Sequence, residues 1–580
     1  DLWKSEFPVP EMGSYEFTVS GWVDLFKTWQ AGLRKKHTAG MPIEIEFEIG
    51  ASQIKRAVES ASAGVRAKLE SWLAGTKEKP SKSAVNAFLG AEITGLMYKC
   101  RDEQRITTYE KVLRVAVDRK KAGFSAWYEL FPRSWSGVPG AHGTFRDCER
   151  MLPEIAGMGF DVIYLPPIHP IGRTKRKGRN NSVKSQAGDP GSPWAIGSAE
   201  GGHKAVHPEL GTVKDFQRFV KKAADKGLEV AIDIAFQCSL DHPYIKAYPQ
   251  WFLWRPDGTV QYAENPPKKY EDIVPINFET DDRRRLWEEL KSIFVFWIKK
   301  GVRMFRVDNP HTKPFAFWEW LIGGIKEKYP DVLFLSEAFT RPKIMYQLAK
   351  LGFTQSYTYY TWRNSKGEFT EYLKELTQTG VKDFFRPNFW PNTPDILAES
   401  LQGQGRPAFI IRLVLAATMS SNYGIYGPAF ELCLNQNVTG KEEYLDSEKY
   451  EIKTWNWDKA GNIKDVIAMV NRIRRENPSL QTTWNIEFCR NNNPNMLSYV
   501  KATESLDNII LVAVNLDPEN IQSCLLSVPL EKLGMEKDIS YVVSDLLNKT
   551  EFTWRGEENY VELDPKNSPA HIFRIDSHVT

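Results

Sequence analysis

Two acidic residues follow two neighbouring apolar segments, where they could do chemistry together. The run 302–307 ends at Asp308, and the run 332–336 ends at Glu337, 29 residues further along the chain. That separation is about one strand–helix–strand unit, so we expect the two carboxylates to face each other across adjacent strand tips. Retaining glycosidases hold such a pair about 5–5.5 Å apart, one as nucleophile and one as acid/base.

Arg306 precedes Asp308 by two residues, and the two-residue period of a strand puts both side chains on the same face. A nearby guanidinium would keep the carboxylate ionised, as a nucleophile requires. Taken alone, Asp308 or Glu337 could instead be structural, capping a helix or pairing with an arginine. A third acid, Asp395, ends the sequence Asn-Thr-Pro-Asp, which by itself also suits a turn or a helix cap.

The segments around these acids alternate between buried strands and amphipathic helices. The predicted strands are 124–131, 161–168, 228–236, 302–308, 332–337 and 384–389, and the predicted helices between them are 145–157, 213–226, 281–300, 314–329 and 342–351. Repeated strand–helix units indicate a parallel sheet with helices outside, and at least six of them favour a (β/α)8 TIM barrel over 121–480. Two long irregular stretches, 169–210 and 237–280, are expected at the catalytic end of this barrel.

Strand-like segments are predicted on both sides of the barrel in the sequence. Residues 1–120 contain alternating runs such as 15–19 and 43–47, and about 50–105 read as inserted helices, which predicts an N-terminal β-sandwich with a helical insert. Residues 481–580 return to short strands and predict a C-terminal β-sandwich. The expected fold is therefore multidomain α/β. The chain does not begin with Met, which leaves room for a longer N-terminus.

Composition is that of an ordinary soluble protein, with 42% hydrophobic and 26% charged residues in 580. The net charge of +3 gives no general attraction to nucleic acid or to membrane, and no apolar run approaches the ~18 residues of a membrane span. The six cysteines are scattered without a C-x-x-C pair, which argues against disulfides and zinc and fits a reducing cytoplasm. We therefore expect a cytoplasmic protein without a cofactor or metal.

Four segments, in order along the chain, resemble the sequence regions of the α-amylase superfamily. They are AIDIAFQ at 231–237, FRVD at 305–308, SE at 336–337 and NTPD at 392–395. The resemblance implies that Asp308 is the nucleophile, that Glu337 is the acid/base, and that Asp395 binds the distorted sugar in the transition state. It also implies that a structural calcium is an option, although no ligand set for one is visible in the sequence.

The chain departs from the common amylase pattern at two positions. Gln237-Cys238 stands where that pattern has Asn-His, and Pro394 stands where it has a histidine. In amylases both histidines bind the sugar ring at the point of cleavage. Their replacement puts simple amylase activity in doubt.

Longer blocks resemble one branch, the bacterial maltosyltransferases that use α-maltose 1-phosphate. The blocks are 165–172, 176–181, 191–197, 263–270, 308–314 and 443–450. Members of this branch extend linear α-1,4-glucans by two glucose units and release phosphate, and they are homodimers. The resemblance therefore implies a retaining transferase with α-maltose 1-phosphate and a glucan acceptor as partners.

A phosphate leaving group needs cationic and amide donors near the nucleophile. The resemblance assigns this site to Lys177, Asn181, Asn265, Tyr270 and Asn309. It assigns the first sugar to Gln237 and Arg306, and the second sugar to Lys449. Without the resemblance, the favoured interpretation of the stretch 173–184 is a basic surface loop.

Two other functions compete with this interpretation. A hydrolase or branching-type enzyme on the same barrel would share the carboxylates but lack the phosphate site. A noncatalytic barrel homologue would act as a binding subunit, and such proteins typically lose the catalytic acids, whereas Asp308, Glu337 and Asp395 are all present.

Overall fold

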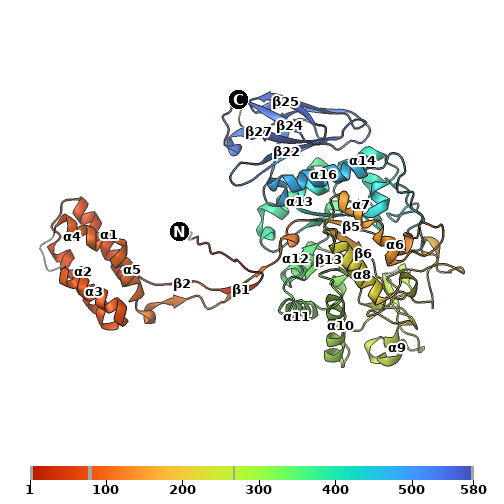
Figure 1. Ribbon diagram of the computed structural model, residues 1–580, viewed down its shortest axis with the longest axis horizontal. Helices are drawn as coiled ribbons and strands as arrows, with labels where there is room; N and C mark the ends of the chain where they lie inside the picture. Colours follow the sequence, from red (N-terminus) through yellow and green to blue (C-terminus); the bar gives the residue numbers. More distant parts are fainter. Residues whose placement is uncertain (1–3, 76–80, 266–267, 577–580) are drawn as a thin grey trace. The chain divides into compact units, whose positions relative to one another are not determined.

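A computed structural model gives the fold and describes residues 4–75, 81–265 and 268–576 (Figure 1). The chain divides into two units, Asp1–Val117 and Asp118–Thr580. Among the helices in the described ranges, none combines the length and the apolar content needed to cross a membrane.

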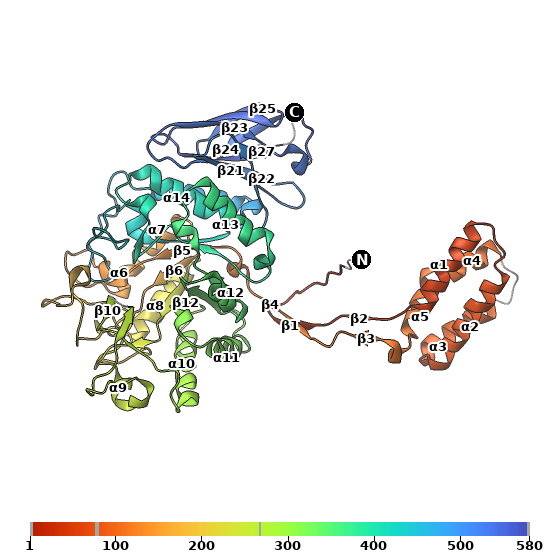
Figure 2. The same cartoon turned by 180° about the vertical axis from the view of Figure 1, so that it is seen from behind.

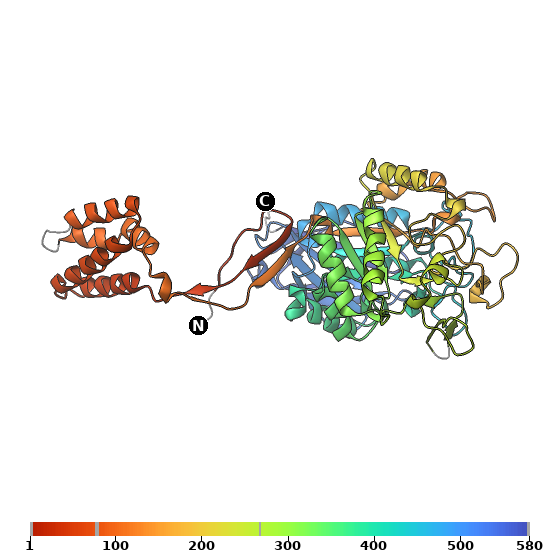
Figure 3. The same ribbon diagram turned by 90° about the horizontal axis from the view of Figure 1, so that it is seen from below.

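The first unit is mainly helical. Its helices are α1 Leu25–Thr38, α2 Glu44–Ser60, α3 Ala63–Gly75, α4 Lys82–Phe88 and α5 Ala91–Lys99, and they gather into one bundle (Figures 1 and 3, red to orange). The bundle core contains Leu33, Ile54, Leu69, Phe88 and Ile93. Two antiparallel strand pairs complete the unit: β1 Gly13–Phe17 with β4 Leu113–Val117, and β2 Ser20–Gly21 with β3 Thr107–Thr108.

This unit corrects part of the sequence-based expectation. In place of an N-terminal β-sandwich, the described residues of the unit hold only these two strand pairs beside the bundle. The strand predicted at 43–47 is wrong, because those residues enter α2. Over five residues, the alternation of Ile43, Ile45 and Phe47 resembles a strand. Over a longer window the helical period is visible, because the buried positions of α2 include Phe47, Gly50, Ile54 and Ala57.

The second unit contains the predicted barrel. Its eight parallel strands, in sheet order along the barrel, are β5 Ser125–Glu129, β6 Val162–Leu165, β7 Glu229–Ile234, β12 Met304–Asp308, β13 Leu333–Glu337, β14 Gln355–Ser356, β15 Asn388–Phe389 and β18 Asn422–Tyr426. Strand β18 pairs with β5, and a parallel bridge from Ser356 to Pro387 joins β14 to the start of β15. These contacts close the sheet, which confirms the (β/α)8 architecture.

Helices surround the barrel (Figure 1). They include α6 Phe145–Glu149, α7 Leu152–Gly157, α8 Val213–Ala224, α10 Arg283–Ile298, α11 Phe315–Lys326, α12 Pro342–Lys350, α13 Lys366–Gln378, α14 Arg406–Met419 and α16 Lys464–Glu476. The barrel interior is filled by large side chains, among them Trp127, Tyr164, Leu335, Tyr357 and Trp390, each about 1% exposed. A packed interior fixes the strand ends that lie above it.

All six predicted barrel strands and all five predicted helices are present, whereas β14 and β18 were not predicted. Strand β14 has only two residues, too few for a recognisable pattern. Strand β18 contains Gly424, which weakens a strand prediction. A Cβ at that glycine would lie 2.3 Å from the ring of Trp390, so the packing of the interior explains its presence.

The C-terminal part forms the expected sandwich (Figure 2). One sheet, in strand order, contains β19 Ile486–Phe488, β21 Met496–Ala502, β22 Ile509–Asn515, β27 Ala570–Asp576, β24 Ser540–Asp545 and β25 Thr550–Arg555. The other contains β20 Arg490–Asn491, β23 Gln522–Ser527 and β26 Glu558–Leu563. Apolar side chains of both sheets share one core, and Figure 2 shows this sandwich beside α13 and α14.

Candidate active site

Asp308 and Glu337 are the last residues of β12 and β13, which are hydrogen-bonded neighbours. The register pairs the two residues directly. Neighbouring strands lie about 4.8 Å apart, so this register places the two carboxyl groups within reach of one sugar carbon. Both side chains are largely buried, with 9% and 14% of their surface exposed.

One guanidinium joins the acids of this cluster. Arg306 donates to Asp308 Oδ1 and to Asp233 Oδ2, both at 2.8 Å, and its Nη2 lies 3.5 Å from Glu337 Oε1. Asp233, on β7, also accepts hydrogen bonds from the Tyr164 hydroxyl and the Trp194 indole. A single buried cation, Arg306, therefore forms ion pairs with three carboxyl groups at unequal distances.

The two register-paired acids have pKa values displaced in opposite directions. Burial alone would raise the pKa of Asp308, but the positive charges of Arg306 and Lys313 outweigh it and lower that pKa. Burial raises the pKa of Glu337 to about 7, and the negative charge of Asp308 adds to the rise, although Arg306 opposes it. The arrangement gives one ionised carboxylate and one acid poised to exchange a proton near neutral pH.

Asn309 donates hydrogen bonds to the carboxyl groups of both Asp308 and Glu337 from the end of β12. Its backbone N–H donates to Glu337 Oε2 at 3.1 Å, and its side-chain amide donates to Asp308 Oδ2 at 3.3 Å. The residue has a left-handed backbone with φ of 42°. Asparagine tolerates this conformation better than most residues.

Lys313 is a second cation of this cluster, and the sequence analysis did not single it out. Its ammonium group lies 3.2 Å from the backbone oxygen of Asn309. Burial lowers the pKa of Lys313, although the charges of Asp308 and Glu337 oppose the shift. Lys313 follows Asp308 by five residues and belongs to the block 308–314, which resembles the maltosyltransferases, and this position could have identified it.

Asp395 and Lys449 form a second group. Asp395 lies in the turn between β16 Asn392–Thr393 and β17 Ile396–Leu397, and Lys449 Nζ lies 2.6 Å from its Oδ1. The same ammonium is 4.8 Å from the ring centre of Trp194, whose indole donates to Asp233. Trp194 therefore connects this group to the catalytic cluster.

Gln237 also lies beside Trp194. It belongs to the short strand β8 Gln237–Cys238, which pairs with β11 Val274–Pro275, and its amide donates to the Trp194 backbone oxygen at 3.3 Å. Gln237 and Lys449 thus contact one tryptophan of the long loop 169–210, while Arg306 and Asp395 are linked to it through Asp233 and Lys449. Trp194 belongs to the block 191–197, which resembles the maltosyltransferases, but the sequence analysis assigned it no role.

Four of the residues predicted to bind phosphate lie on two loops, whereas the fifth, Asn309, lies beside the carboxylates. Lys177 is only 3% exposed, and among the described residues its ammonium has no hydrogen-bond or ion-pair partner. Asn181 has a left-handed backbone, and its buried Oδ1 also lacks a partner among those residues. Tyr270 ends β10 Lys268–Tyr270 and is half-buried. Asn265 ends the paired strand β9 Ala263–Asn265, but its side chain lies outside the described part of the structure.

Asp272 links these loops electrostatically and was missed by the sequence analysis. It is 3% exposed, and its Oδ1 has no hydrogen-bond partner among the described residues. Burial raises its pKa, while the positive charges of Lys177 and Lys449 act in the opposite direction. The predicted phosphate lysine and the predicted second-sugar lysine therefore act on one carboxyl group.

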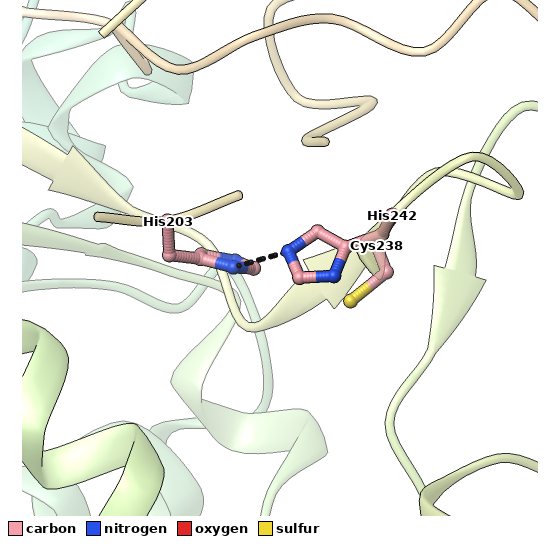
Figure 4. Close-up of side chains that lie close together, drawn as sticks. All are labelled: His203, Cys238 and His242. Carbon is pink, nitrogen blue, oxygen red and sulfur yellow. Dashed lines mark hydrogen bonds between the residues drawn. The ribbon is translucent and has the colours of Figure 1, made fainter. Parts of the chain in front are cut away.

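His203, Cys238 and His242 lie close together near the site (Figure 4), with potential ligand atoms within 4.8 Å of one another. The hydrogen bonds use every ring nitrogen: Tyr244 N–H donates to His242 Nδ1, His242 Nε2 lies 3.1 Å from His203 Nδ1, and His203 Nε2 lies 2.9 Å from the Ala235 oxygen. Burial lowers the pKa of both histidines, to about 4 for His203. This is a chain of neutral imidazoles, and a metal on His242 Nε2 would leave a protonated Nδ1 facing the Tyr244 N–H.

A second group, His142, His207 and Glu209, also brings potential ligands together. Its two imidazole rings are stacked, with centroids 5.2 Å apart and planes 7° from parallel. Their in-plane lone pairs therefore lie in two separate, nearly parallel planes, an unfavourable arrangement for binding one ion.

Known proteins resemble this chain over its whole length. Two family models match: "Alpha-1,4-glucan:maltose-1-phosphate maltosyltransferase, domain N/S" over residues 1–119, and "GLGE, C-terminal" over residues 488–575. Proteins named alpha-1,4-glucan:maltose-1-phosphate maltosyltransferase from Chlorobaculum tepidum and Methylacidiphilum infernorum are 56% and 54% identical to it. Each match covers 99% of this chain, and 87% and 86% of the respective relative.

Solved structures with the same fold include α-amylases. A maltogenic α-amylase from Thermotoga neapolitana superposes with a TM-score of 0.60 at 20% identity, covering 79% of this chain and 99% of that one. An α-amylase from Geobacillus thermoleovorans, solved with acarbose, gives 0.59 at 15% identity over 80% of this chain and 100% of that one. With the sequence relatives, this likeness in fold leads to one conclusion: the chain belongs to the family of α-1,4-glucan:maltose-1-phosphate maltosyltransferases and is a glycosyltransferase with the α-amylase fold.

Proposed function

We propose that this protein transfers maltosyl units from α-maltose 1-phosphate to the non-reducing end of linear α-1,4-glucans, releases phosphate, and retains the α configuration. The observation that carries the proposal is the pair Asp308 and Glu337, which share one register position but have oppositely displaced pKa values. The names of its relatives support the choice of donor and acceptor.

In the first step, a carboxylate oxygen of Asp308 attacks the anomeric carbon of the donor. The bond from that carbon to the phosphate oxygen breaks, and the electron pair leaves with the phosphate. Glu337 supplies a proton to the departing oxygen, although phosphate is a good leaving group and needs little help. Arg306 and Lys313 keep Asp308 ionised before the attack.

In the second step, the ionised Glu337 takes the proton of the 4-hydroxyl at the end of a glucan chain. The hydroxyl oxygen attacks the anomeric carbon, and the bond to Asp308 breaks to regenerate the carboxylate. Each step inverts the anomeric carbon, so the product bond is α-1,4. Asn309 positions both carboxyl groups through its two hydrogen bonds during this exchange.

The remaining predicted residues would bind the donor. We assign its phosphate to Lys177, Asn181, Asn265, Tyr270 and Asn309, its first sugar to Gln237 and Arg306, and its second sugar to Lys449, with Asp395 on the distorted ring. Lys177, a residue only 3% exposed, and the buried Oδ1 of Asn181 have no hydrogen-bond partner for these polar groups among the described residues, which supports a polar ligand at this place.

We also propose a homodimer in a reducing compartment, the cytoplasm. The six cysteines are all free thiols, which fits such a compartment. In the first unit, Leu113 and Val115 of the two-stranded ribbon β1/β4 are 40% and 38% exposed, and an isolated two-stranded ribbon is marginally stable in water. Light scattering of the purified protein tests the dimer.

The decisive experiment incubates the protein with α-maltose 1-phosphate and a short maltooligosaccharide, and follows phosphate and chain length together. Phosphate release matched by glucans that grow in steps of two hexoses would support the proposal. Shortened or reshuffled chains without phosphate release would instead indicate an ordinary amylase-type enzyme. The Asp308→Asn variant should abolish either reaction and serves as the background control.

A further inference from the structure

Two loops of the candidate donor site, far apart in the sequence, hold each other through a reciprocal pair of hydrogen bonds. The Asn180 amide donates to Asp446 Oδ1 at 2.9 Å, and the Asp446 backbone N–H donates to Asn180 Oδ1 at 2.7 Å. We propose that Asn180 and Asp446 form a positioning clamp that keeps the phosphate-binding loop and the second-sugar loop in register, so that the enzyme recognises both parts of its donor together. This inference rests on the proposed function.

The clamp lies next to the residues it would position. Asn180 precedes Asn181 and follows Lys177 by three residues, while Asp446 precedes Lys449 by three residues. Both clamp residues have left-handed backbones, with φ of 50° and 52°. This conformation is unfavourable for residues with a side chain, least so for Asn and Asp, and the reciprocal hydrogen bonds offset the cost.

A buried arginine ties the same two loops at a second point. Arg133 is 4% exposed and donates to the backbone oxygen of Gly191 at 2.9 Å, and to those of Glu448 and Lys449 at 2.8 and 2.9 Å. Hydrogen bonds thus connect the two loops at two places: through Arg133 in the interior, and through the Asn180–Asp446 clamp at the exposed rim. Because the clamp is exposed, its removal should loosen the rim without opening the core.

The interior between the loops is where a donor would bridge them. Lys177 and Lys449, one from each loop, both act electrostatically on the buried carboxyl group of Asp272. The Oδ1 atoms of Asp272 and Asn181 are buried without a hydrogen-bond partner in the described part of the chain. A ligand with a phosphate at one end and hydroxyls at the other would meet Lys177 and Asn181 on one loop and Lys449 on the other, with Asp272, which belongs to neither loop, electrostatically coupled to both lysines.

This geometry predicts a selective defect. If the clamp is lost, the free loops sample wider separations, and a donor that needs both loops loses more affinity than a donor that needs one. α-Maltose 1-phosphate contacts both loops, whereas α-maltosyl fluoride has no phosphate for the Lys177 loop. The clamp should therefore affect the KM for the phosphorylated donor more than kcat, and more than the KM for the fluoride.

The test compares Asn180→Ala, Asp446→Ala, the double Ala variant and the exchanged pair Asn180→Asp with Asp446→Asn. Asn180→Ala removes both hydrogen bonds and should raise the KM for α-maltose 1-phosphate roughly tenfold, the size expected for lost hydrogen bonds of this kind, and the KM for α-maltosyl fluoride about twofold or less. Asp446→Ala keeps the hydrogen bond from its backbone N–H and should raise the KM for the phosphorylated donor by less. The double variant should be no worse than Asn180→Ala, because that change leaves no hydrogen bond of the clamp to lose. The exchanged pair keeps both hydrogen bonds with one donor reversed and should restore the KM.

Asn567→Ala is the matched control, since it removes an exposed hydrogen bond of 2.8 Å from Asn567 to Asp564 in the C-terminal sandwich. It should leave both KM values unchanged. Equal defects with both donors, additive single changes, or no rescue by a folded exchanged pair would overturn the clamp. If the unchanged protein releases no phosphate, both the proposed function and the clamp are wrong. If the unchanged protein releases phosphate but the variants have the same KM values as it has, only the clamp is wrong.

Discussion

Asp308 and Glu337 occupy the same register position on adjacent strands, yet the pKa of one carboxyl group is lowered and that of the other is raised. Burial favours a raised pKa at both groups, but it is outweighed only at Asp308, where Arg306 lies at 2.8 Å and Lys313 adds a second positive charge. Arg306 lies 3.5 Å from Glu337, and the charge of ionised Asp308 opposes ionisation there. The proposed division of roles between nucleophile and acid/base therefore depends on the charges that surround each carboxyl group.

The first prediction concerns the second half of the reaction. Glu337→Gln should slow transfer to a glucan by 10²- to 10⁴-fold, roughly the contribution of a general acid/base. The first half should suffer less, because phosphate leaves without much protonation. An intermediate should then accumulate, and mass spectrometry of the intact protein should detect one added maltosyl group. Absence of the adduct, with donor still consumed at the unchanged rate, would contradict the role given to Glu337.

The second prediction concerns pH. The raised pKa of Glu337, about 7, means that the free enzyme loses its protonated acid as the pH rises through neutrality. The kcat/KM for an alkyl α-maltoside, a donor whose leaving group needs a proton but does not itself titrate in this range, should therefore fall above about pH 7. The Glu337→Gln variant should lack this alkaline fall. A fall that persists in the variant would assign it to another group.

The third prediction concerns Asp272. Its pKa is raised in the folded protein, so its contribution to stability is full at pH values below about 3.9 and is lost as the pH rises through the higher folded pKa. Asp272→Asn should remove this loss and make the protein more stable at neutral pH. Because the change also removes a negative charge near Lys177 and Lys449, inorganic phosphate should bind more tightly. Thermal unfolding with and without phosphate, compared at acid and neutral pH, measures both effects.

The fourth prediction concerns metals. His203, Cys238 and His242 lie close enough to suggest a zinc site, but their ring nitrogens are already engaged in a chain of neutral hydrogen bonds. A chelator should therefore change neither the melting temperature nor the activity, and elemental analysis should find no stoichiometric zinc. His242→Ala should destabilise the protein by about 1–3 kcal/mol, because it leaves the Tyr244 N–H without its acceptor. One zinc per chain, removed by the chelator with loss of stability, would reverse this interpretation.

The sequence predicted the reaction centre better than the surroundings of the donor. Asp308 and Glu337 end long apolar runs, so local pattern alone places them at strand tips. Lys313 and Asp272 carry no such signal, because their importance depends on burial beside charges that only the folded chain assembles. The roles of the binding residues stay predictions, and the side chain of Asn265 lies outside the described structure.

The groups proposed for chemistry and for recognition come from different parts of the barrel. Arg306, Asp308 and Glu337 are fixed by strands, whereas Lys177 and Lys449 come from long connections between them. Strands in a closed sheet resist change, but connections accept insertion and exchange. On this proposal, changes confined to the loops could convert a barrel that hydrolyses α-glucans into one that synthesises them. Transplanting the stretches 169–210 and 443–450 together into a related barrel would be the corresponding engineering experiment.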